Sequence, residues 1–430
     1  MQATSQTEQS DQRKGDQAEG GARLASEGGQ PIRTTPFPSV GDISGRRIDE
    51  AEIEAVAAVL RSGKLNRTAG TVTTEFENTF GKLYGIEHVV ASTSGTSAIH
   101  VAVAAINPSP GDEIITTGLS DAGTVLPILA QNAVPVFADV LPDSGALDPE
   151  SVRSKITDRT KAIIAVHLYG APARVEELRE IADEHGIYLI EDCAQAYLTE
   201  TASGKLAGTV GHLGCFSLQQ SKHITAGDGG LTITADDELG RRARLFTDKG
   251  WPRDTNERTH LFLGLNYRMT EVHAAIGLAQ LAKLEQIVAD RRRTAEQLAE
   301  VVNALPGLKT VPVKGASWWI FPIFVDESAA GADANTYSKL LAAEGVGFGA
   351  GYIQTPLYLT PVLAEGHTYG DSGFPITEAK SQYVRGLCPV TEDLINGGKM
   401  LVFSWNENFT DADVADIAAA ITKVHTAVTS

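Results

Sequence analysis

The sequence HVVASTSGTSAIHVAVAAI, which runs from His88 to Ile106, joins three kinds of segment. The apolar run from His88 to Ala91 is predicted as a buried strand, and Ser92 to Ser97 as a turn of small polar residues. The apolar segment from Ala98 to Ile106 is predicted as a helix. A strand, a polar turn and a helix in this order are typical of an α/β protein, and the start of such a helix can bind a phosphate.

The same alternation of strands and helices continues on both sides of this segment. Short apolar strands are predicted at Glu113–Thr117, Val134–Ala138, Lys161–His167, Ile187–Glu191 and Leu231–Thr234, and helices at Asp49–Arg61, Thr74–Tyr84, Val175–His185 and Asp236–Phe246. A long helix then starts at Glu271 and ends at Pro306-Gly307. The pattern predicts an α/β fold with a mainly parallel sheet.

The chain is predicted to have three parts. Residues 1–33 are rich in Gln, Ser, Gly and Glu, lack the apolar segment of a signal peptide, and are expected to form a disordered tail. Residues 34–305 form an N-terminal segment and a large domain. Residues 306–430 form a smaller C-terminal α+β domain, with strands at Ser317–Val325, Val346–Gly349 and Met400–Ser404 and helices at Ala334–Glu344 and Asp411–Val424.

The composition argues against several classes of protein. A formal charge of −18 argues against nucleic-acid binding, because a phosphate backbone is held by clustered Lys and Arg. No run approaches the roughly 18 apolar residues of a membrane-spanning helix, so no membrane contact is expected. The three cysteines, Cys193, Cys215 and Cys388, have no spacing typical of a metal site or a disulfide framework. We therefore expect free thiols, no metal and a cytoplasmic location.

Two segments carry a candidate catalytic site: IEDCAQA at Ile190 to Ala196 and FSLQQSKHITAGDGG at Phe216 to Gly230. An enzyme that uses pyridoxal 5′-phosphate (PLP) needs a lysine amine to form a Schiff base and move a proton, and Lys222 precedes a glycine-rich loop. It also needs a carboxylate to keep the pyridine nitrogen protonated, a role open to Asp192. The cofactor phosphate and ring oxygen need donors, which could come from Gly95, Thr96, Ser217 and Gln195.

Each of these residues also has an ordinary structural explanation. A single Asp after a strand is usually a cap or turn residue, a Ser-Gly-Thr turn often only starts a helix, and a lysine between Ser and His is usually solvated. His167 and His223 are isolated histidines, which are more often structural. His167 nevertheless follows a strand and is expected to share a crevice with Asp192. The order and spacing of the whole set favour the catalytic interpretation.

From about Asp49 to its C-terminus, the chain closely resembles the DegT/DnrJ/EryC1/StrS family of sugar aminotransferases. The resemblance is carried by motifs in one order, among them Ser94-Gly95-Thr96, Gly111-Asp112-Glu113, Val166-His167-Leu168-Tyr169-Gly170, Glu191-Asp192, Ser217 to Lys222, Gly227-Asp228-Gly229-Gly230 and Leu265 to Glu271. It implies the type I aminotransferase fold, with a mixed, mainly parallel sheet in the large domain. It also implies the cofactor roles given above for Lys222, Asp192, Gln195, Ser217, Gly95 and Thr96.

The resemblance further implies a homodimer with shared active sites. Asn266 matches the position that reaches the cofactor phosphate from the neighbouring subunit, and Arg268 is a nearby cation for substrate or for an ion pair with Glu271. Asp121 departs from the family, which usually has an aromatic residue there that stacks on the cofactor ring. The ring-stacking residue therefore stays open, and Asp121 becomes a candidate substrate contact. Asp228 stands where the family commonly has Glu.

The reaction implied by the resemblance is transfer of an amino group from glutamate or glutamine to a ring ketone. The segment Ser217 to Lys222 is more similar to the branch that aminates keto-cyclitols of the scyllo-inosose type in aminoglycoside biosynthesis. The branch that aminates nucleotide-linked keto-sugars, which commonly has His-Pro before the lysine, is the alternative. Sugar dehydration or aromatisation on the same scaffold stays open, but the dehydratases replace the lysine with histidine. A non-catalytic PLP-binding regulator, with Asp121 marking lost catalysis, is the remaining interpretation.

Overall fold

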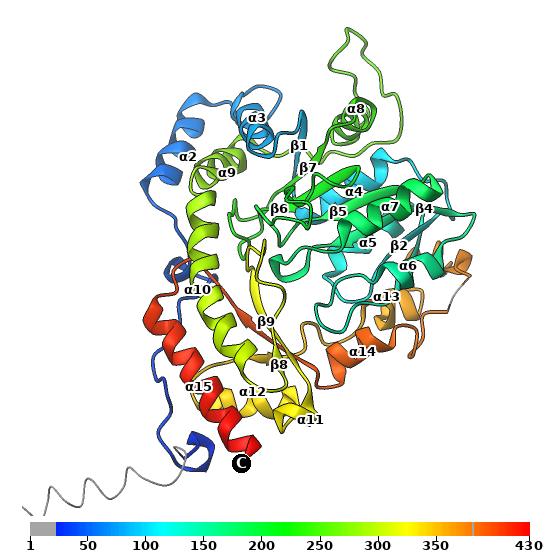
Figure 1. Cartoon of the computed structure of the whole chain (residues 1–430). Helices are drawn as coiled ribbons and strands as arrows, with labels where there is room; N and C mark the ends of the chain where they lie inside the picture. Colours follow the sequence, from blue (N-terminus) through cyan, green and yellow to red (C-terminus); the bar gives the residue numbers. More distant parts are fainter. Residues whose placement is uncertain (1–22, 381) are drawn as a thin grey trace, which may run out of the picture.

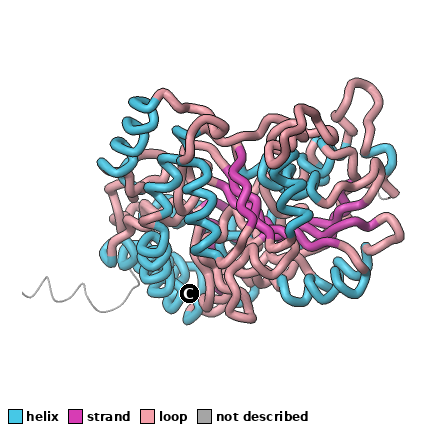
Figure 2. Tube along the Cα trace, turned by 90° about the horizontal axis from the view of Figure 1, so that it is seen from above, coloured by secondary structure: helices cyan, strands magenta, loops and turns pink. Residues whose placement is uncertain are grey.

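The computed structural model describes residues 23–380 and 382–430 and contains two β-sheets that lie in different parts of the molecule (Figures 1 and 2). The larger sheet has seven strands in the order β1-β7-β6-β5-β4-β2-β3. Its strands are β1 (His88–Ser92), β2 (Glu113–Thr117), β3 (Val134–Ala138), β4 (Thr160–Val166), β5 (Tyr188–Asp192), β6 (Leu213–Ser217) and β7 (Gly230–Thr234). β7 pairs antiparallel with β1 and β6, whereas the other four pairs are parallel, so the sheet is mixed and mainly parallel, as predicted.

Helices cover both faces of the large sheet because alternate residues of its strands point to opposite sides. In β4, for example, Ile164 packs in one core with α4 and α8, whereas Ile163 packs in another with α6 and α7. The helices of this part are α2 (Glu50–Ser62), α3 (Val72–Tyr84), α4 (Gly95–Ala105), α5 (Leu126–Ala130), α6 (Pro149–Lys155), α7 (Val175–His185), α8 (Asp237–Phe246) and α9 (Glu271–Leu281).

The smaller sheet is antiparallel, with the strand order β10-β11-β9-β8. Its strands are β8 (Leu308–Lys309), β9 (Ile320–Val325), β10 (Gly349–Ala350) and β11 (Met400–Ser404). The accompanying helices are α10 (Leu284–Ala304), α11 (Glu327–Ala330), α12 (Ala334–Ala343), α13 (Pro361–Ala364), α14 (Pro389–Asn396) and α15 (Asp411–Thr429). A core with Trp318, Phe321 and Trp405 at its centre joins this sheet to α10, α12 and α15.

The structure differs from the sequence prediction at the long helix and at the N-terminal tail. The single helix expected from Glu271 is two helices, α9 and α10, which separate at Lys283, whose Nζ lies 2.8 Å from Glu52 Oε1. Residues 1–22 of the expected tail lie outside the described residues. Residues 23–33 pack on the small sheet and its accompanying helices, which are together called the small domain below. Leu24 is buried, and Ala25 N donates to Glu344 Oε1 at 2.8 Å. Within the described chain, no helix is long and apolar enough to cross a bilayer.

Candidate active site

A cavity of about 350 Å³ opens where β5 and β6 end. Two of its residues are the last residues of these strands, Asp192 and Ser217, and the start of α4 closes another side. Lys222 reaches it from the loop between β6 and β7, and Trp319 and Tyr352 reach it from the small domain. The site therefore lies at the carboxyl ends of parallel strands, where α/β sheets bind their ligands.

Asp192 presents a buried carboxylate to this cavity. Its side chain accepts from Thr124 Oγ1 at 2.8 Å and from Ala194 N at 3.1 Å. Burial raises the pKa of the Asp192 carboxyl, although these two hydrogen bonds and the charge of Lys222 oppose the rise. No cationic side chain of the described residues lies within ion-pair distance of it. A buried carboxylate of this kind is suited to a cationic group on a ligand, such as a protonated pyridine nitrogen.

Lys222 provides an amine that can lose its proton near neutral pH. Burial lowers its pKa to about 8, while the negative charges of Asp192 and Asp121 act in the opposite direction. Its Nζ lies over the face of Trp319, 3.8 Å from the ring centroid. A lysine that forms a Schiff base must react as the neutral amine, so both the position and the pKa suit that chemistry.

The start of α4 and the end of β6 form a close-fitting surface for an anion. Gly95 and Thr96 open α4, where main-chain N–H groups have no partner within the helix, and the helix dipole favours negative charge. A Cβ at Gly95 would lie 2.7 Å from Ser217 Cβ and 2.9 Å from its Oγ. Only glycine allows this close approach, which leaves the N–H groups and the Ser217 hydroxyl facing one cavity. This arrangement fits a phosphate group.

Gln195 is held in one orientation at the edge of the cavity. Its Oε1 accepts from Tyr169 N at 2.8 Å, and its Nε2 donates to Tyr352 Oη at 3.0 Å. Because Oε1 is occupied, the amide presents N–H groups toward the cavity, where the second hydrogen of Nε2 remains for a ligand oxygen. PLP therefore fits the residues present: an amine, a buried carboxylate, an anion cradle and a neutral donor converge on one cavity.

The structure places His167 outside the cavity, contrary to the expected shared crevice with Asp192. It is fully buried, its Nε2 lies 2.8 Å from Glu191 Oε2, and its Nδ1 accepts from Ala173 N at 3.0 Å. Both ring nitrogens are thus occupied within the protein. The alternation of β5 explains the difference, since Glu191 and Asp192 point to opposite faces of the sheet.

Arg268 and Asn266 also lie outside the cavity of their own chain. Arg268 pairs with Asp248, whereas Glu271, its expected partner, accepts from Val72 N at 2.7 Å and Thr73 Oγ1 at 2.6 Å. Asn266 forms a β-bridge with Asp248. Its contact with a neighbouring subunit stays a prediction.

Asp121 lines the cavity, and its Oδ1 accepts from Gly123 N at 2.7 Å. The aromatic residues of the described chain that line the same cavity are Trp319 and Tyr352. Neither was predicted from the sequence, although the double tryptophan before β9 was a signal that could have been used. Thr124, whose hydroxyl donates to Asp192 Oδ2, was not predicted as a site residue either.

Comparisons with known proteins show what the whole chain is similar to. A model of the DegT/DnrJ/EryC1/StrS aminotransferase family matches residues 46–401. The chain is 34% identical to the L-glutamine:2-deoxy-scyllo-inosose aminotransferase of Streptomyces kanamyceticus, over 94% of this chain and 97% of that protein. Its structure resembles an aminotransferase from Psychrobacter cryohalolentis (TM-score 0.79, 27% identity, 92% and 100% of the chains). It also resembles DesI crystallised with its TDP-sugar product (TM-score 0.76, 28% identity, 94% and 96% of the chains).

Proposed function

Because the chain belongs to the DegT/DnrJ/EryC1/StrS aminotransferase family, we propose that this aminotransferase uses PLP to move the amino group of glutamine to a keto-cyclitol. The name of the Streptomyces kanamyceticus relative supports both the donor and an acceptor of the 2-deoxy-scyllo-inosose type. The observation that carries the proposal is the convergence of Lys222 and Asp192 on one cavity. Amination of a nucleotide-linked keto-sugar is the second candidate, supported by the likeness to DesI.

When bound, PLP supplies an aldehyde that carries the amino group and a ring that withdraws electrons from the carbon that loses its proton. Lys222 Nζ would hold the cofactor between turnovers and then carry the proton between substrate and cofactor carbons. Asp192 would keep the proton on the ring nitrogen, since its own carboxylate is stabilised by a cation in that place. Gly95, Thr96 and Ser217 would hold the phosphate, and Gln195 would donate to the ring oxygen.

We also propose a homodimer in which Asn266 of each chain reaches the cofactor phosphate bound by its partner. Leu261, Leu263 and Leu265 precede Asn266 and are exposed, Leu263 to 85%, as expected for a surface that another chain covers. The cytoplasm is the proposed location, because Cys193, Cys215 and Cys388 are free and buried.

The test is transamination by the purified, PLP-loaded protein, with product identification by mass spectrometry. Glutamine and glutamate are each paired with 2-deoxy-scyllo-inosose and with a TDP-linked keto-sugar. Lys222→Ala is expected to abolish turnover, whereas Lys314→Ala, at an exposed site, leaves it unchanged. Wild-type turnover by Lys222→Ala would refute the catalytic assignment. Aminated TDP-sugar without aminated cyclitol would select the second candidate.

A further inference from the structure

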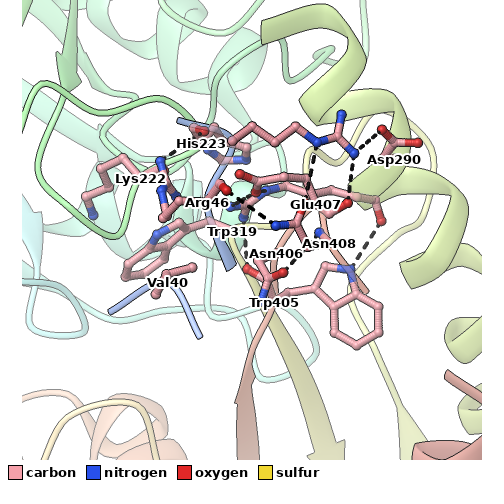
Figure 3. A network of polar contacts seen from close by, with 12 residues as sticks. Val40, Arg46, Lys222, His223, Asp290, Trp319, Trp405, Asn406, Glu407 and Asn408 are labelled. Carbon is pink, nitrogen blue, oxygen red and sulfur yellow. Dashed lines mark hydrogen bonds and ion pairs between the residues drawn. The ribbon is translucent and has the colours of Figure 1, made fainter. Parts of the chain in front are cut away.

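Three consecutive carbonyl groups around Lys222 accept hydrogen bonds from side chains that are distant in sequence (Figure 3). Arg46 Nη1 donates to Lys222 O at 2.7 Å, and its Nη2 donates to His223 O at 3.4 Å. Trp319 Nε1 donates to Ser221 O at 2.8 Å. Because Lys222 lies in a loop and not in a helix or strand, these bonds hold main chain that no sheet or helix holds.

Burial of Arg46 is energetically unfavourable, because the residue carries a positive charge and is only 3% exposed. Burial lowers its pKa to about 10, although the charge of Glu407 acts in the opposite direction. Among the described residues, no carboxylate forms an ion pair with it, and its Nε has no hydrogen-bond partner. Its Nη1 and Nη2 donate to the carbonyl oxygens of Lys222 and His223. A buried cation that binds main-chain oxygens beside the catalytic lysine has a positioning role that a surface salt bridge would not have.

The segment that carries Arg46 is anchored on both sides of this contact. Asn408 Nδ2 donates to Ser44 O at 2.9 Å, and Arg47 Nη2 donates to Glu407 O at 3.1 Å. Arg47 Nη2 also lies 2.6 Å from Asp290 Oδ2 on α10. Arg47 therefore fixes the segment to the small domain. Arg46, next to it in the chain, reaches Lys222 instead (Figure 3).

Trp319 holds the side chain of Lys222 as well as its neighbouring main chain. The indole Nε1 donates to Ser221 O, and the main-chain N of Trp319 donates to Tyr169 O at 2.8 Å. With both ends fixed, the ring face lies 3.8 Å from Lys222 Nζ. An ammonium over an indole face is attracted by the ring quadrupole, which gives the protonated Lys222 side chain a defined resting place.

We propose that Arg46 and Trp319 are positioning residues: Arg46 fixes the main chain of Lys222, and Trp319 fixes its amine whenever that amine is not bonded to the cofactor. The proposal rests on the role of Lys222 in the proposed function. Proton transfer depends on the reacting atoms being held within a short distance, so a loosened Lys222 loop slows the reaction without removing the amine.

The test compares the same substitution at two adjacent arginines, Arg46→Lys and Arg47→Lys. PLP-free protein is mixed with PLP, reduced with borohydride at increasing times, and the modified Lys222 peptide is quantified by mass spectrometry. Lysine cannot reproduce a two-donor fork, so Arg46→Lys is expected to slow attachment and lower kcat about tenfold, with KM for glutamine nearly unchanged. Arg47→Lys is expected to leave both rates within about twofold, because it makes no contact with Lys222.

Equal attachment rates for Arg46→Lys and wild-type protein would overturn the role of Arg46. If Arg46→Lys does not fold, Trp319→Phe is tested in its place. Trp319 is half-buried, and phenylalanine keeps an aromatic ring there but has no N–H to donate to Ser221 O. Slower attachment is expected, and an unchanged rate would overturn the proposal. Attachment to Lys222 is measured without an acceptor, so a wrong acceptor assignment alters turnover but not this readout.

Discussion

In PLP-free protein, Lys222 is expected to react as an amine with a pKa of about 8. At pH 7 about a tenth of such amines are neutral, about 200-fold more than for a lysine with the usual pKa of about 10.4. The cause is burial, which disfavours the charged ammonium form more than the nearby carboxylates of Asp192 and Asp121 stabilise it. Competitive labelling with trace acetic anhydride between about pH 6 and 11 measures this reactivity, since only the neutral amine reacts.

The direction in which the Asp121 carboxylate shifts the pKa of Lys222 can be tested with Asp121→Asn. The Asp121 carboxylate stabilises the ammonium form and raises the pKa of Lys222, so its removal is expected to move the labelling midpoint below that of wild type. Asp143→Asn, at an exposed site that does not line the cavity, is the matched control and should leave the midpoint unchanged. A wild-type midpoint above about 10, or an upward move in Asp121→Asn, would refute the reasoning.

Thr124→Val removes the hydroxyl that donates to Asp192 Oδ2 at 2.8 Å and is expected to raise the pKa of that carboxyl further. A larger Kd for PLP, measured by fluorescence titration, supports this, and an unchanged Kd contradicts it. Gly95→Ala places a Cβ 2.7 Å from a side chain of β6, so PLP affinity should fall about tenfold while affinity for pyridoxal, which lacks the phosphate, stays the same. Arg291→Met leaves the fully buried carboxylate of Glu407 without its cationic partner. The substitution should lower the free energy of unfolding, measured by urea titration, by about 3–5 kcal/mol.

Much of the fold can be predicted because its signals are local. Helix α2 is capped at its start by Asp49, whose side chain forms a capping box with Glu52, and at its end by Gly63, whose φ is +67°. The break between α9 and α10 has no such signal. It contains neither glycine nor proline, and Lys283 is held there by Glu52, a residue more than two hundred positions earlier in the chain.

The residues of the candidate site likewise include some with a local sequence signal and others that only distant contacts bring into place. Lys222 and Asp192 can be found from the sequence because each lies within a short motif at a strand end or in a glycine-rich loop. The sequence does not place Trp319 and Tyr352 at the cavity, because they reach it through the packing of the small domain. Arg46 was not predicted either, because the N-terminal segment brings it to the main chain of Lys222 and not to the cavity. The expected place of His167 in the cavity is wrong because its hydrogen-bond partner, Glu191, points to the opposite face of the sheet from Asp192.

Helix α10 connects these distant parts of the site. Its first half, with Leu284 and Ile287, packs in the core that contains β6 and β7, and its second half, with Leu298, packs in the core of the small sheet. Between them, Arg291 Nη1 donates to Trp318 O at 3.2 Å, next to the residue that supports Lys222. Helix α10 thus fixes the small-domain side of the cavity relative to the loop that carries Lys222. The domain boundary at residues 305–306 stays a prediction, and the position of Trp319 depends on packing against α10, which ends before that boundary.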